Sequence, residues 1–98
     1  MNIGTTIKTI RKSQGMSQGK LASLVGIQQS TLSFIENNKA RPHVKTLEAI
    51  SEHTGVPVPL IYIWSVGLED VPEENHKLYN ELWPKVEELA NFVFNGKN

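Results

Sequence analysis

The stretch Ser17–Pro42 reads SQGKLASLVGIQQSTLSFIENNKARP, and its apolar residues fall into two short groups on either side of Gly26. Each group has the three- and four-residue spacing of a helix that buries one side. The apolar or small residues are Leu21, Ala22, Val25, Leu32 and Ile35. Ala22 allows two helices to cross closely, and Gly26 allows the chain to turn without a Cβ clash. The stretch therefore predicts two helices that meet at a steep angle, with Ser17 as the N-cap of the first.

The second of these helices, over about residues 28–37, leaves an unusual set of side chains unburied. They are Gln29, Ser30, Ser33, Phe34 and Asn37, with no Glu or Lys among them. Short amide and hydroxyl groups are suited to base edges in the DNA major groove, where Gln can bind adenine through two hydrogen bonds. This face therefore indicates base recognition, and an ordinary polar surface is the alternative interpretation.

The remainder of the chain also predicts helices. Apolar spacing gives further helices over about 3–14, 44–54 and 57–64, with Asn2 as the N-cap of the first. These segments, together with the pair described above, make a five-helix domain over residues 1–66.

The chain changes character beyond this domain. An acidic segment is followed by apolar residues spaced by four, four, three and four positions. Because Pro84 interrupts a continuous helix, we expect two helical pieces there, over about 75–82 and 84–95. No segment has a strand pattern. The expected fold is all-α, with a helical extension over residues 67–98 that completes the core or mediates dimerisation.

Composition and charge narrow the classes of function. The chain has 98 residues, no cysteine and no apolar run of membrane-spanning length, so a soluble, cytoplasmic protein is expected. Residues 1–45 carry seven Lys or Arg and one acidic residue, a net charge of +6, whereas residues 46–98 carry three and nine, a net charge of −6. This asymmetry suggests a basic face for a polyanion. Chance segregation of charge is the alternative.

No motif for enzyme chemistry is present in the sequence. The three histidines, His43, His53 and His76, have no second ligand three or four positions further along the chain, and neighbouring glutamates have no accompanying base or nucleophile. No phosphate-cradling glycine motif and no nucleophile elbow occurs. We therefore expect no enzyme activity, no metal and no cofactor.

The quoted stretch, followed by HVKTLEAISEHTGVPVPLI, resembles the helix-turn-helix domain of phage repressor and Cro-type (XRE-like) regulators over about residues 3–64. In that family the second helix crosses the DNA backbone and the third lies in the major groove. The resemblance implies base reading by Gln28, Gln29, Ser30, Ser33 and Phe34. It implies phosphate contacts by Gln18, Asn37, Lys39 and Arg41, to which His43 is added because it lies beside Arg41. It also implies an ion pair, Arg11 with Glu36, that ties the first helix to the third.

Three positions depart from the pattern of the family. Asn38 stands where Gly is usual. His43 stands where a capping Ser is common, so the helix that follows is expected to be less well capped. Phe34 stands where many members carry a polar residue, and either contact with a thymine methyl or packing against neighbouring protein would explain it.

The aromatic residues suggest a second surface. Six of the seven follow the stretch Ser17–Pro42, where they either complete the core or form a surface for self-association. The candidate interface residues are Leu60, Ile61, Trp64, Tyr79 and Trp83. A homodimer is expected because two copies can read a palindrome whose half-sites lie about 34 Å apart.

The sequence thus predicts a transcriptional regulator that binds double-stranded DNA in a sequence-specific manner, most simply a repressor that occupies a palindromic operator as a homodimer. An antitoxin or a restriction-modification controller with the same domain is one alternative. A protein-interaction adaptor that has lost DNA binding is another. A regulatory domain cut from a larger enzyme fits less well, because the acidic helical tail makes the chain look whole.

Overall fold

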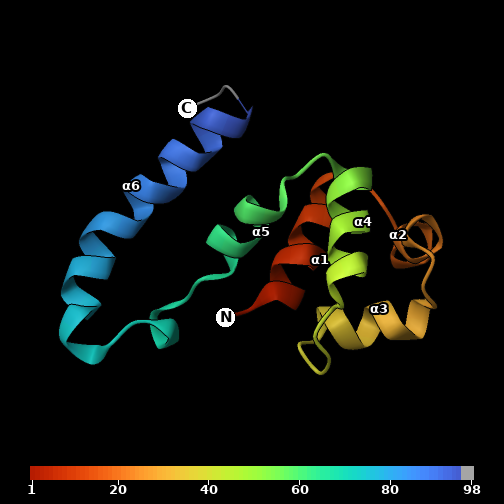
Figure 1. Cartoon of the computed structure of the whole chain (residues 1–98), viewed down its shortest axis with the longest axis horizontal. Helices are drawn as coiled ribbons and strands as arrows, with labels where there is room; N and C mark the ends of the chain where they lie inside the picture. The colour runs from red at the N-terminus through yellow and green to blue at the C-terminus, as the bar shows by residue number, and fades with distance from the viewer. Residues whose placement is uncertain (96–98) are drawn as a thin grey trace. The chain divides into compact units, whose positions relative to one another are not determined.

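The computed structural model describes residues 1–95, with side chains described as far as Val93. Residues 96–98 of the expected extension, and the side chain of Phe94, lie outside the described residues. The described part contains helices and turns without any strand, so the prediction of an all-α fold is confirmed (Figure 1). The helices are α1 (Ile3–Ser13), α2 (Gln18–Val25), α3 (Gln29–Glu36), α4 (Val44–Thr54), α5 (Val58–Ser65) and α6 (His76–Asn95), with short 3₁₀ helices η1 (Leu68–Asp70) and η2 (Glu73–Asn75) before α6.

The described residues group into two compact units, which are considered separately below. One unit is Asn2–Ser65, which holds α1 to α5, and the other is Met1 with the chain from Val66 onward. No helix in the described part is both long enough and apolar enough to cross a membrane.

The helix ends in the first unit follow from local chemistry. The Ser17 hydroxyl accepts a hydrogen bond from the Lys20 N–H at 3.0 Å, as expected of an N-cap. Gly26 ends α2 in the left-handed conformation, with φ of 76°. Asn2 differs from the expectation, because its side chain caps nothing. Its backbone N–H instead donates to the Ser65 carbonyl at 3.0 Å, which joins the two ends of this unit. The His43 side chain does not cap α4 either. This agrees with the expectation that His caps a helix less well than Ser.

The core of the first unit is formed by one side of each of its five helices. The buried apolar cluster is Ile7, Ile10, Leu21, Ala22, Leu32, Ile35, Leu47, Ile50 and Ile61. Burying a large aliphatic side chain contributes about 1.5–3 kcal/mol, so this cluster dominates the stability of the unit. The residues predicted to face inward from α2 and α3 belong to it, apart from Val25, which packs against it partly buried.

A close approach of α1 to α3 was not anticipated from the sequence. Gly4 lies so near the Ile35 carbonyl that a Cβ atom added at Gly4 would overlap it. The Gly4 N–H donates to Oδ1 of Asn38 at 3.0 Å, and Nδ2 of Asn38 donates to the Thr5 hydroxyl at 2.9 Å. Asn38 has a φ of 60°, a left-handed conformation that Asn tolerates. The end of α3 is therefore fixed against the start of α1.

The second unit corrects one expectation. Helix α6 is continuous from His76 to Asn95 and contains Pro84, so the prediction of two pieces is wrong. Proline removes one N–H and crowds the carbonyl four residues earlier, here that of Asn80. Asn80 and Pro84 are both exposed, so water can reach the carbonyl that loses its partner. Helix-forming residues on both sides of the proline compensate for its cost.

Short contacts arrange the turns before α6. The Gly67 N–H donates to the Asp70 carboxylate at 2.9 Å and thereby lowers the pKa of Asp70, assisted by the ammonium group of Met1 at 3.0 Å. A ring nitrogen of His76 lies 2.9 Å from the Val71 carbonyl, and the Tyr79 hydroxyl donates to the Val66 carbonyl at 3.3 Å. These contacts fix the start of the helix.

Candidate nucleic-acid interface

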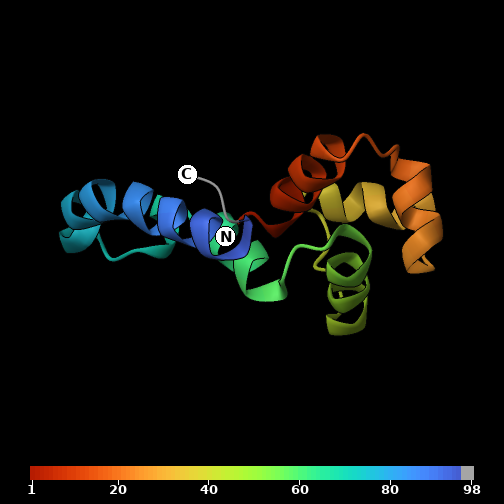
Figure 2. The same ribbon diagram turned by 90° about the horizontal axis from the view of Figure 1, so that it is seen from above.

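Helices α2 and α3 form the angular pair that the sequence predicts. Their axes cross steeply in both ribbon views (Figures 1 and 2). The Ile27 N–H donates to the Ala22 carbonyl at 3.0 Å across the turn at Gly26. Ala22 is buried, with 2% of its surface exposed, so the small side chain lies where the helices meet. Gln28 occupies the N-cap position of α3, one residue before the helix begins.

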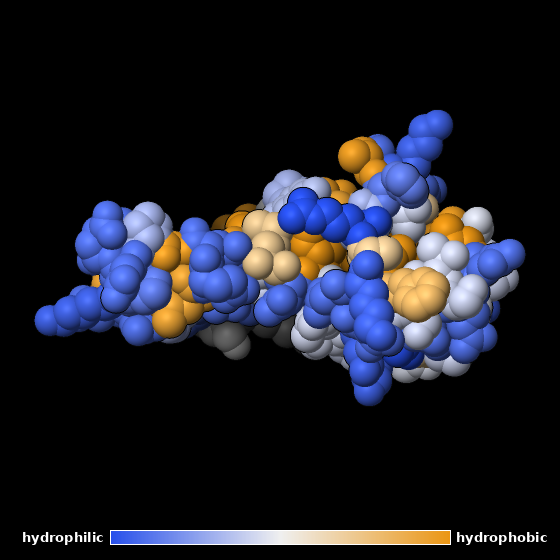
Figure 3. All heavy atoms as spheres, turned by 90° about the horizontal axis from the view of Figure 1, so that it is seen from below, coloured by the Kyte–Doolittle hydropathy of each residue, from blue (hydrophilic) through white to orange (hydrophobic). Residues whose placement is uncertain are grey.

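One side of α3 is buried and the other is open. Leu32 and Ile35 face the core. The predicted base-reading residues Gln28, Gln29, Ser30 and Phe34 are exposed, and Ser33 is half-buried. Phe34 is 55% exposed, and Figure 3 shows an apolar area among hydrophilic side chains on the side of the molecule where α3 lies. The structure thus brings these five residues together on or at the start of one short helix.

A buried ion pair supports this helix from behind. The guanidinium of Arg11 donates to both carboxylate oxygens of Glu36, at 2.7 and 3.0 Å, and to the Met16 carbonyl at 2.8 Å. Both charged side chains are buried, and the hydrogen bonds to Glu36 raise the pKa of Arg11. The ion pair implied by the resemblance is therefore present and links α1 to the end of α3.

The ion pair is connected to the exposed face through Gln18. Nε2 of Gln18 donates to the Glu36 carboxylate at 3.1 Å, and Oε1 of Gln18 accepts a longer hydrogen bond from Nε2 of Gln29 at 3.5 Å. A buried carboxylate thus orients one amide, which in turn orients the next. Sequence reasoning assigned Gln18 to phosphate alone. Its distance from Glu36 along the chain left no local pattern that would reveal this contact.

The loop after α3 carries the predicted phosphate-binding residues. Asn37, Lys39, Arg41 and His43 are all exposed, and no acidic residue lies between positions 37 and 47. The Lys39 N–H donates to the Phe34 carbonyl at 2.9 Å, and the Asn37 N–H donates to the Ser33 carbonyl at 3.0 Å. The basic loop is therefore held directly at the end of the exposed face of α3. Such side chains and backbone groups are typical phosphate ligands.

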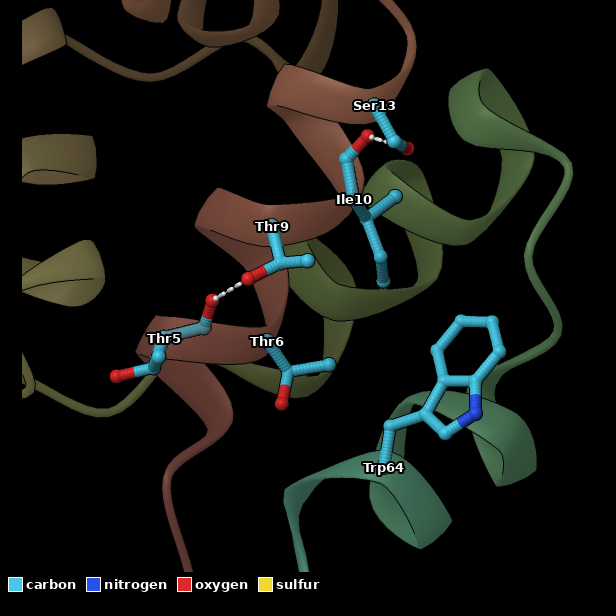
Figure 4. Close-up of a pocket in the computed structure, with 6 residues that line it drawn as sticks. All are labelled: Thr5, Thr6, Thr9, Ile10, Ser13 and Trp64. Carbon is cyan, nitrogen blue, oxygen red and sulfur yellow. Dashed lines mark hydrogen bonds between the residues drawn. The ribbon is translucent and has the colours of Figure 1, made fainter. Parts of the chain in front are cut away.

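The residues expected at a dimer interface lie in different environments. Leu60 and Ile61 are 1% and 0% exposed, so they offer no free area to a partner. Trp64 is half-buried and lines a cleft of about 400 Å³ with Thr5, Thr6, Thr9, Ile10 and Ser13 (Figure 4). The Tyr79 and Trp83 rings stack on each other, with centroids 5.5 Å apart.

Two helices joined at a glycine, with the second helix presenting a polar side flanked by a basic loop, define a helix-turn-helix module, a class that binds DNA through its second helix. A family model described as "Helix-turn-helix" matches residues 7–61, more than half of the chain. The chain therefore belongs to the helix-turn-helix family.

Several relatives agree with this assignment. The chain is 35% identical to the immunity repressor protein of Bacillus phage phi105 over 80 residues, which cover 82% of the chain and 53% of that protein. It is 39% identical over 57 residues to the HTH-type transcriptional regulator SutR of Escherichia coli K12, covering 58% of the chain and 31% of that protein. For the regulator PuuR of the same organism, the identity is 36% over 53 residues, which cover 54% of the chain and 29% of that protein.

The resemblance to phage repressor-type regulators is thus confirmed. The aligned residues span about half of the phage repressor and less than a third of the two bacterial regulators. No solved structure matches the chain significantly.

Proposed function

We propose that this chain is a non-enzymatic, cytoplasmic transcriptional regulator that binds double-stranded DNA in a sequence-specific manner, most simply as a repressor. The observation that carries the proposal is the exposed side of α3, which presents amide, hydroxyl and aromatic groups without any acidic side chain. A surface of this kind can enter the negatively charged major groove and form hydrogen bonds with bases. The names of the relatives, a repressor and transcriptional regulators, agree with it.

Two sets of residues are assigned different roles in this proposal. Gln28, Gln29, Ser30, Ser33 and Phe34 read bases. Gln18, Asn37, Lys39, Arg41 and His43 contact phosphates and set the position of α3 in the groove. Gln18 is oriented by Glu36 and reaches Gln29, so it couples the backbone contact to the base contact. In protein–DNA complexes, phosphate contacts usually position the protein and base contacts provide the sequence specificity.

The proposal includes a homodimer on a palindromic operator, with residues 1–66 binding DNA and residues 67–98 serving association. One α3 helix of eight residues contacts only a few base pairs. Two copies related by a two-fold axis present two such helices to half-sites about 34 Å apart. Specific affinity then gains from both half-sites, because the second contact becomes intramolecular.

The proposal is tested by selection of binding sites from a random duplex library, followed by measurement of the mass of the complex. We expect one enriched palindromic sequence bound by two copies of the chain. Absence of any enriched sequence would contradict specific DNA binding. Enrichment of a single half-site by one copy would contradict the homodimer alone.

A further inference from the structure

One residue on the exposed side of α3 differs in chemistry from those around it. Phe34 has a large apolar side chain and is 55% exposed. Ser30 lies one turn before it and Asn37 nearly one turn after it, and both are polar and exposed. Aromatic side chains in a helix lean towards its N-terminus, which places the ring of Phe34 over the turn that contains Ser30. The short Ser30 side chain leaves this ring open to a molecule that contacts α3.

The backbone at Phe34 is fixed from two directions. Its carbonyl accepts a hydrogen bond from the Lys39 N–H at 2.9 Å, so the turn that leads into the basic loop is closed at Phe34. On the opposite side of α3, Leu32 and Ile35 are 0% and 3% exposed and belong to the core. Phe34 therefore lies along the helix between Gln29, which is assigned to bases, and the loop that is assigned to phosphates.

The base edges in the major groove offer a phenyl ring one complementary group. These edges carry hydrogen-bond donors, hydrogen-bond acceptors and a single apolar group, the methyl group at C5 of thymine. A phenylalanine side chain has no group that donates or accepts a conventional hydrogen bond, so the methyl group is its partner of matching chemistry. The methyl group also lies at the edge of the base nearest to the sugar and phosphate of its own strand. A side chain next to a phosphate-binding loop is thus placed to reach it.

We infer that Phe34 reads the C5-methyl group of a pyrimidine in the major groove; the inference deepens the proposed function and rests on it. Contact with the ring removes the methyl group and the exposed part of Phe34 from water, which is favourable in proportion to the apolar area buried. In unmodified DNA the recognised base is thymine. Methylation of cytosine at C5 creates the same apolar group, so the inference extends to 5-methylcytosine at the position that faces Phe34.

The inference is tested first by removing the methyl group from the DNA. Each thymine of the operator selected by the wild type is replaced singly by uracil, which lacks the methyl group and keeps every hydrogen-bonding group. At one position of the half-site, the wild type should bind the uracil duplex about fourfold more weakly, the effect of one buried methyl-sized group. Phe34→Ala should bind the thymine and uracil duplexes equally at that position. Equal binding by the wild type at every position would overturn the inference.

Two further variants separate methyl reading from other roles of the ring. Gln29→Ala removes hydrogen bonds from the same helix, so it should weaken binding to both duplexes and keep the ratio of about four between them. Phe34→Leu keeps an apolar side chain and should retain part of that ratio. Both positions are exposed, so the variants are expected to fold, which circular dichroism checks. If Phe34→Ala binds both duplexes more weakly but keeps the ratio, the ring contacts a sugar or a second copy of the chain, and the inference is overturned.

A methylated duplex tests whether the methyl group alone is read. The sensitive thymine–adenine pair is replaced by a cytosine–guanine pair, with and without a methyl group at C5 of the cytosine. The wild type should bind the methylated duplex about fourfold more tightly than the unmethylated one, and Phe34→Ala should bind the two equally. A gain from thymine over uracil without a gain from cytosine methylation would contradict the inference, because both bases carry the same methyl group.

The same experiments separate this inference from the proposed function. If selection from the random library enriches no sequence, the proposed function fails and the inference fails with it. If one sequence is enriched, and the wild type binds it with the same affinity when its thymines are replaced by uracil, sequence-specific DNA binding stands and only the reading of the methyl group by Phe34 fails.

Discussion

Gly4 shows how a single residue controls the position of α3. Its backbone lies against the Ile35 carbonyl, and its N–H binds Asn38. Gly4→Ala should destabilise the fold by about 1–3 kcal/mol, because the added methyl must displace backbone. Gly19→Ala is the matched control in α2, since the neighbour of its Cβ is the flexible side chain of Gln29, and helix propensity favours Ala there. Urea denaturation of both variants measures the difference. Equal stability would show that α1 and α3 do not approach this closely.

Glu36 is the second residue on which the position of α3 depends. Glu36→Gln leaves the charge of Arg11 buried without its counterion, which should lower the free energy of unfolding by about 3–5 kcal/mol. The exposed Glu48→Gln in α4 should change it by less than about 0.5 kcal/mol. Urea titrations of the two variants provide the measurement. A cost below about 1 kcal/mol for Glu36→Gln would mean that the ion pair contributes little to the fold.

The continuity of α6 can be tested at Pro84, which lies inside the helix. In a continuous helix, Pro84→Ala restores a hydrogen bond to the Asn80 carbonyl and should stabilise the helix locally by up to about 3 kcal/mol. If a second helix began at Pro84, the missing N–H would be unpaired in any case, and the substitution would have little effect. Amide hydrogen exchange of residues 80–88 distinguishes the two arrangements. Unchanged protection would contradict the continuous helix.

The elements show what the sequence can and cannot predict. The sequence predicts the bounds of helices α1 to α5 to within a few residues, because Ser17, Gly26 and Pro57 fix the conformation of the residues next to them in the chain. The sequence pattern predicts a break at Pro84, whereas α6 is continuous. The outcome depends on whether the helix-forming residues on both sides offset the free-energy cost of one lost hydrogen bond, and this balance cannot be read from Pro84 alone. The exposed side of α3 followed from periodicity. The contacts of Gln18 with Glu36, and of Gly4 with Ile35, join residues far apart in the chain, so no local pattern reveals them.

At the scale of the whole molecule, DNA affinity depends more on where the charged residues lie than on the net charge of the chain. The net charge is zero, yet the half that contains α3 carries the excess of Lys and Arg. DNA affinity should therefore depend strongly on salt, because bound cations are released from the phosphates that the basic residues neutralise. The acidic half, residues 46–98, would limit non-specific binding to DNA through charge repulsion.

The central claim is that the exposed side of α3 reads bases, and it is tested most directly by one titration series. Wild type, Gln29→Ala and Arg41→Ala are titrated against the selected operator and a scrambled duplex over a range of salt concentrations. Gln29→Ala should lose about 1–3 kcal/mol on the operator and much less on the scrambled duplex, with an unchanged salt slope. Arg41→Ala should lose similar amounts on both and reduce the slope by about 1. Equal losses of Gln29→Ala on both duplexes would contradict the claim.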